Sequence, residues 1–85
     1  MELKVGDTVF MSLVGRQEYR PTVDNPHHLI GVVIEVLQWE LAEAKRDPDS
    51  HYPYRVRWSN GRENVYRILD LNPATIPDKK LEDYL

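Results

Sequence analysis

The chain has 85 residues, of which 41% are hydrophobic and 29% are charged, and we expect a single domain over residues 1–85. Two packed domains are excluded, because a chain this short buries only about 60 to 65% of its unfolded surface. The formal net charge of -3 argues against a surface coated with basic charge, and the absence of cysteine excludes disulfides, iron–sulfur clusters and a thiol nucleophile.

The chain carries no sequence signal for membrane insertion or secretion. Its longest apolar run, residues 29–34, is far shorter than the roughly 20 residues that cross a bilayer. The acidic start at Glu2 is unlike a signal peptide. We therefore expect a soluble, cytoplasmic protein without a membrane partner.

The first third of the chain predicts one strand and a long loop. A Gly-Asp turn signal at residues 6–7 precedes an alternating segment that places Val9 and Met11 on one face of a strand. Residues 13–29 contain two prolines and follow neither the helical nor the strand period, so they predict a loop. At about 17 residues this loop exceeds ordinary connections, which is typical of loops that bind a ligand or move.

Residues 30–37 form the most β-prone segment of the chain. They are rich in branched side chains, and Gly31 permits a bend. Their alternation predicts a second strand on which three apolar side chains share one face: Val32, Ile34 and Val36.

Helix-forming residues dominate only in residues 38–46, and the segment that follows, which contains Pro48, ends whatever structure precedes it. A helix this short is marginal alone, so it depends on Trp39 and Leu41 finding a surface to pack against. The segment fits either a short helix or a strand that runs into a loop, and the pattern leaves both open.

A β-hairpin is the strongest local signal. Tyr54, Val56 and Trp58 alternate with arginines, and Asn60-Gly61 predicts the turn. A two-residue loop would turn the charged Glu63 and Arg67 toward the core. We prefer a three-residue bulged loop around Gly61, which sets Asn64, Tyr66 and Ile68 against the apolar face. Five residues then lie outside: Arg55, Arg57, Glu63, Val65 and Arg67.

The preferred hairpin register brings Arg55 near Arg67, a like-charge pair that is destabilising unless an anion or a carboxylate compensates it. The pattern fits either a solvated arginine face that Glu63 screens or a surface for an anion or an acidic partner. Beyond the hairpin, Pro73 and Pro77 interrupt regular pairing. We expect a short last strand near residues 74–76 and a helical turn at residues 81–85.

The order of these elements resembles a small SH3-like β-barrel, and about half of the chain takes part. The Trp58-Ser59-Asn60-Gly61 segment, followed by Asn64-Val65-Tyr66-Arg67, is similar to the hallmark of the mind-bomb-type SH3-like repeat. The Val5-Gly6-Asp7 start and the Asp70-Leu71 end are also similar to Tudor and KOW-type barrels. The resemblance implies a mainly all-β, five-stranded barrel with a long first loop and a short helix between strands 2 and 3.

Catalytic and metal-binding signals are weak. His27 and His28 are neighbours whose side chains diverge, and His51 lies in a separate loop without a spaced carboxylate motif. The serines lack a nucleophile-elbow context, and no glycine-rich phosphate loop is present in the sequence. We expect no enzymatic activity, no metal and no cofactor.

The leading hypothesis is a non-enzymatic protein-interaction module, an accessory or regulatory factor of the kind found in bacteria or bacteriophages. It would bind a protein partner through the arginine-bearing hairpin face and the long first loop, since Arg and Tyr are enriched in interface cores. The candidate binding residues are Arg55, Arg57, Arg62, Arg67, Tyr19, Arg20 and Tyr52.

The alternative hypothesis is a nucleic-acid-binding barrel that sets Arg55, Arg57, Arg62 and Arg67 on a phosphate backbone.

A third hypothesis is a reader of methylated lysine, which would need an aromatic cage. Its candidates are Tyr19, Tyr52, Tyr54, Trp58 and Tyr66, although Trp58 and Tyr66 are expected in the core. Exposure of Val65 together with Val33 would favour a protein interface. A homodimer through edge strands is left open.

Overall fold

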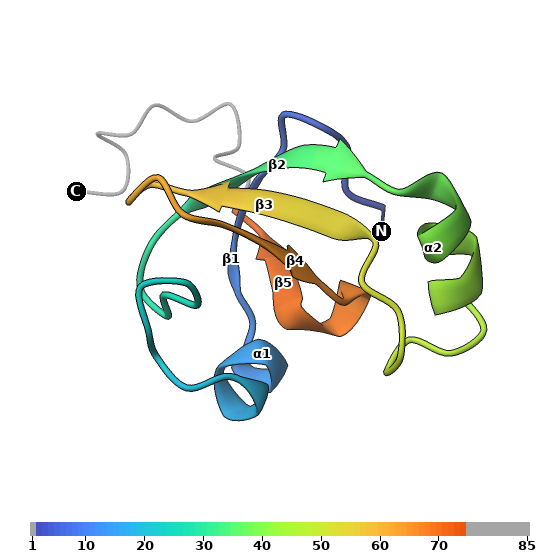
Figure 1. Ribbon diagram of the computed structural model, residues 1–85, viewed down its shortest axis with the longest axis horizontal. Helices are drawn as coiled ribbons and strands as arrows, with labels where there is room; N and C mark the ends of the chain where they lie inside the picture. The colour runs from blue at the N-terminus through green and yellow to red at the C-terminus, as the bar shows by residue number, and fades with distance from the viewer. Residues whose placement is uncertain (1, 75–85) are drawn as a thin grey trace.

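The computed structural model describes residues 2–74, which form one antiparallel sheet of five strands with two short α-helices and a 3-10 helix. The sheet order is β4-β3-β2-β1-β5, so successive strands pair as neighbours and β5 returns beside β1. Figure 1 shows the sheet curving around its inner face, with α1 beyond the end of β1 and α2 after β2. The strands are β1 (Thr8–Met11), β2 (Gly31–Val36), β3 (Tyr54–Trp58), β4 (Glu63–Tyr66) and β5 (Leu71–Pro73).

The core lies on the inner face of the curved sheet. Val9 and Met11 of β1 are fully buried, as their alternation predicts. Trp58 and Tyr66 are also buried, which confirms that they belong to the core. The other buried apolar members are Leu3, Val33, Leu41, Tyr54, Val56 and Leu71. Within the described residues, no helix is long and apolar enough to cross a membrane.

The predicted three-residue hairpin loop is confirmed. The Trp58 and Arg62 backbones pair across Ser59, Asn60 and Gly61, and Gly61 takes a φ of 86° that glycine adopts readily. Asn64 lies opposite Val56, as expected. Tyr66 likewise lies opposite Tyr54, whereas Ile68 belongs to the 3-10 helix Ile68–Asp70 and not to the strand.

The prediction that residues 13–29 form a loop was wrong for the start of this segment, which is helical. Leu13–Glu18 forms α1, which Ser12 caps by accepting a hydrogen bond from the Gly15 N–H at 3.1 Å. Gly15 permits close packing, since a Cβ there would stand 2.7 Å from the Asp70 carbonyl oxygen. Because this packing is long-range, the helix leaves no periodic signal in the sequence.

The expectation that Val32, Ile34 and Val36 share a face was wrong. A register shift between Val33 and Glu35 interrupts the alternation of β2. Val32 therefore lies on the outer face, while Val36 packs against the core. Val33 is buried, so the pairing of exposed Val33 and Val65 that would favour an interface does not occur.

Of the two alternatives for residues 38–46, a short helix or a strand that runs into a loop, the structure has the helix, α2 (Gln38–Ala44). Within this helix, Leu41 and Ala44 are buried, whereas Trp39 faces away from the core. The last strand, expected near residues 74–76, instead spans Leu71–Pro73. Residues 75–76 and the helical turn expected at 81–85 lie outside the described residues.

Candidate functional site

An open apolar groove runs along the outer face of β2 and β3. Ile30 and Val32 are exposed there, and Val32 lies directly opposite Arg57 in the strand pairing. The alternation that buries Gly31 and Val33 turns Ile30 and Val32 outward. The groove holds about 510 Å³ and is lined by Ile30, Val32, Ile34, Arg57, Trp58, Ser59 and Gly61. We call it the β2–β3 groove.

Three arginines of the hairpin pair with carboxylates, and of these Arg57 lines the groove. Arg57 binds Glu63 of the neighbouring strand, with its Nη2 donating over 2.7 Å and its Nε over 2.9 Å. Arg55 Nε donates to Glu35 at 3.1 Å, and Arg62 lies 3.8 Å from Asp24. The outer face therefore combines apolar side chains with ion pairs, which reduce the net positive charge of this face.

Arg67 does not belong to this face. The expectation that it lies outside was wrong, since it is 7% exposed. Its Nε donates to both Asp70 carboxylate oxygens at 3.1 Å, and its Nη2 donates to Oδ1 at 2.8 Å. These hydrogen bonds raise the pKa of Arg67 above its usual value. The like-charge pair of Arg55 and Arg67 is also wrong, because Arg55 faces Val65.

The buried carboxylate of Asp70 ties α1 to the 3-10 helix. It accepts the Tyr19 hydroxyl at 2.7 Å and the Arg67 backbone N–H at 2.9 Å. Burial, and then the bond to Asp70, raise the pKa of Tyr19 above its usual value. Tyr19 and Arg67 thus act as structural groups here, and sequence patterning alone could not separate this role from binding.

Three of the five candidate cage aromatics, Tyr19, Trp58 and Tyr66, pack against one another. Tyr66 meets both Tyr19 and Trp58 edge to face, with ring centroids 5.6 Å apart in each pair. The Trp58 indole N–H donates to the Tyr66 hydroxyl at 2.9 Å, and burial raises the pKa of Tyr66 to about 12. This arrangement argues against the methyl-lysine interpretation, because the Trp58 and Tyr66 rings are buried in the core.

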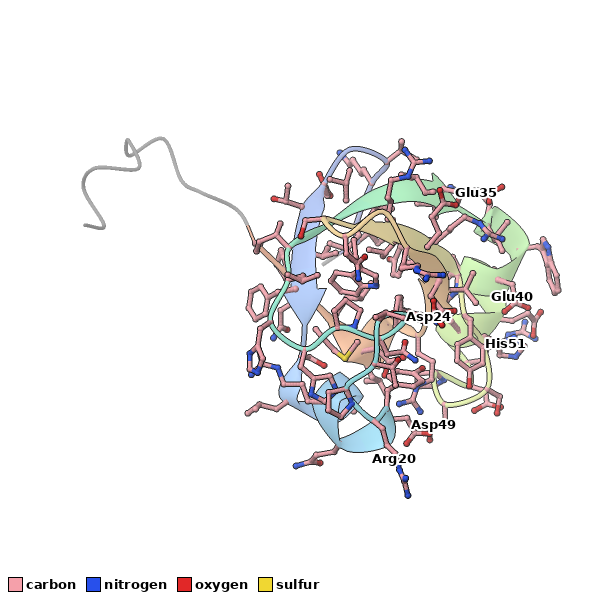
Figure 2. All side chains as sticks on the ribbon, turned by 60° about the vertical axis from the view of Figure 1, so that its left-hand side comes forward. Arg20, Asp24, Glu35, Glu40, Asp49 and His51 are labelled. Carbon is pink, nitrogen blue, oxygen red and sulfur yellow. The ribbon has the colours of Figure 1, made fainter. Side chains whose placement is uncertain are left out.

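The first loop lies beside the hairpin. Asn60 Nδ2 donates to the Val23 carbonyl at 2.8 Å, and the Tyr66 hydroxyl donates to Asn25 Oδ1 at 2.8 Å. In Figure 2, the loop segment that carries Asp24 crosses in front of the strands. The two regions named in the sequence hypothesis, the hairpin and the first loop, are therefore neighbours.

The other predicted binding residues are scattered. Arg20 is exposed after α1 and points away from the domain in Figure 2, and Tyr52 is exposed before β3. The Tyr52 backbone N–H donates to Glu40 at 2.9 Å, while Glu40 also meets His51 at 3.2 Å. Both bonds lower the pKa of Glu40. The structure does not bring Arg20 and Tyr52 together with the groove.

No metal site or open reactive group emerges among the described residues. His27 Nε2 lies 2.8 Å from the Tyr19 carbonyl oxygen, and His51 is held by Glu40. No group of three potential ligands that could hold a metal ion occurs in residues 2–74.

The sequence hypothesis missed two surface features. Ile30 lines the groove because it precedes Gly31, which faces the core. The alternation of side chains around Gly31 is the sequence signal that could have predicted the exposure of Ile30. Trp39 is 68% exposed, although its position beside Leu41 suggested packing. Its exposure depends on how α2 docks, which local sequence does not specify.

No family model, curated protein or solved structure matches the chain. The function therefore has to be argued from the geometry of the described residues.

Proposed function

We propose that the chain is a non-enzymatic protein-interaction module that binds a protein partner through the β2–β3 groove and the adjoining first loop. The observation that carries this proposal is the apolar groove of Ile30, Val32 and Ile34, which lies beside the ion pair of Arg57 and Glu63. Apolar side chains that are exposed together on a small domain are typical of a contact surface. An accessory or regulatory role in the cytoplasm, without catalysis, fits a surface of this kind.

We also propose that the domain is SH3-like. The strand order β4-β3-β2-β1-β5 and the 3-10 helix between β4 and β5 support this proposal, as does the hairpin motif from Trp58 to Arg67. The expected barrel is not closed in the described residues, because β4 and β5 are the two edges of the sheet and do not pair, so the proposal rests on the order of the strands.

Nucleic-acid binding has less support than protein binding. Of its four candidate arginines, Arg67 is buried against Asp70 and the other three face carboxylates. A phosphate would compete with a carboxylate at each of these exposed arginines, where an ion pair contributes about 0 to 1 kcal/mol.

A titration of the labelled protein with a short mixed-sequence oligonucleotide, followed by amide-resolved NMR at low and moderate salt, separates the two interpretations. We expect no salt-dependent shifts at residues 55–62, because these arginines are already paired. Shifts confined to those residues that fade as salt rises would contradict the protein-binding proposal and favour phosphate contacts.

The direct test of the groove is a charged substitution within it. Val32→Asp should abolish partner binding, whereas Leu69→Asp should not. Both side chains are 38% exposed, and Leu69 lies in the 3-10 helix and does not line the groove.

A further inference from the structure

The largest exposed side chain outside the groove is Trp39 on α2. Its exposed fraction is 68%, while the same helix buries Leu41 and Ala44 against the sheet. The indole therefore adds little to the hydrophobic core. Tryptophan is the residue type most enriched among side chains that dominate binding energy, so an indole held on a helix surface is suited to contact a partner.

The surroundings of Trp39 are acidic. Residues 35–49 contain five carboxylates and two basic side chains. Glu43 is exposed one helical turn after Trp39, so the two side chains share a face of α2. Within residues 2–74, Glu43 makes no ion pair.

Most of the remaining charges of this region pair with groups other than Trp39 and Glu43. Both carboxylate oxygens of Glu40 are held by His51 and the Tyr52 backbone, as Figure 2 shows for Glu40 and His51. Lys45 pairs with Glu2, and Glu35 pairs with Arg55. Arg46 is the other basic side chain, two turns beyond Trp39. Of the two carboxylates on α2, Glu43 is the one that makes no ion pair within residues 2–74.

We propose that Trp39 and Glu43 form a second docking surface, which takes a basic segment of a protein partner. A guanidinium or ammonium group would lie over the indole ring and be attracted by its π face, while Glu43 supplies the opposite charge. This surface goes beyond the groove proposed above, because it lies on a different element and fits a cationic occupant.

The two tryptophans can be observed separately. The Trp58 indole N–H is buried and donates to Tyr66, whereas Trp39 is open to solvent, so two distinct indole N–H signals are expected in NMR. The probe is a synthetic hexapeptide that alternates arginine and glycine, and its control carries glutamine in place of arginine.

We expect the arginine peptide to shift the Trp39 indole signal and the Glu43 amide, and the glutamine peptide to leave both unchanged. Trp39→Ala should weaken binding about tenfold, and Glu43→Gln about threefold. Trp39→Tyr should keep most of the affinity, since a phenol ring retains a π face. Leu13→Ala is the matched control, because Leu13 is 72% exposed on α1 and should leave the affinity unchanged.

Three results would overturn this inference. The first is equal binding of the two peptides, and the second is wild-type affinity for the arginine peptide in Trp39→Ala. The third is a dimer in sedimentation that Trp39→Ala dissociates, because a second copy would then be the occupant. Val32→Asp should bind the peptide as the wild type does, which separates this test from that of the groove.

Discussion

Replacing Asp70 with asparagine should lower the free energy of unfolding by about 3 to 5 kcal/mol. The Asp70 carboxylate is fully buried and accepts hydrogen bonds from the Arg67 guanidinium, the Arg67 backbone and the Tyr19 hydroxyl. Asparagine keeps the shape but removes the charge, so the buried guanidinium of Arg67 keeps only the exposed carboxylates of Glu18 at 3.9 Å and Asp49 at 3.8 Å. Urea denaturation followed by far-UV circular dichroism measures the change.

A matched control comes from the other side of Arg67. Asp49 lies 3.8 Å from Arg67 Nη1, but its side chain is 76% exposed. Asp49→Asn should therefore change the free energy of unfolding by less than about 1 kcal/mol. Should Asp70→Asn fail to fold, the double variant Arg67→Met, Asp70→Leu should recover a folded domain, because it removes both charges together. Equal stability of Asp70→Asn and the wild type would refute the structural role of the pair.

Gly31→Ala should destabilise the domain by about 1 to 3 kcal/mol, the usual cost of overpacking a core. A Cβ at this position would stand 2.5 Å from Val56 Cγ1 and 2.8 Å from Trp58 Cε3. Both neighbours are fully buried on β3, so neither can move without disturbing the core. The loss should appear as a lower denaturation midpoint with an unchanged m-value.

The control for this substitution is Gly61→Asn in the hairpin loop. Gly61 has no heavy atom within 4 Å of its ideal Cβ, so asparagine would meet no crowding there and would carry only the backbone strain of a φ of 86°, which it bears better than most other residues. We expect a change of less than about 1 kcal/mol. Greater loss in Gly61→Asn than in Gly31→Ala would show that crowding at β2 does not limit the stability of the fold.

Local alternation predicted much of the sheet. Val9 and Met11 face the core because a strand must bury one side. The Asn60-Gly61 turn located the hairpin, and the preference for an apolar over a charged inner face selected the three-residue loop. Trp58 and Tyr66 were predicted as core residues by the same alternation. The register shift between Val33 and Glu35 in β2 was not predicted, since it breaks the strict alternation on which the prediction for this strand depends.

The candidate site was harder to predict than the fold. The sequence marks Arg67 as the last arginine of a basic hairpin, but the chain turns after Tyr66 into a 3-10 helix that brings Asp70 back to it. That local reversal converts a supposed binding residue into a buried ion pair. Carboxylates from distant segments pair with Arg55 and Arg62, and nothing in the hairpin sequence announces those partners.

The measurement that tests the proposed function most directly is quantitative affinity capture from the cells that produce the protein. Wild type, Val32→Asp and Leu69→Asp are compared as baits after circular dichroism shows that all three are folded. The proposal predicts a protein that wild type and Leu69→Asp recover equally, and that Val32→Asp recovers at least about tenfold less. Equal recovery by all three baits, or no recovered protein, would contradict binding through the β2–β3 groove.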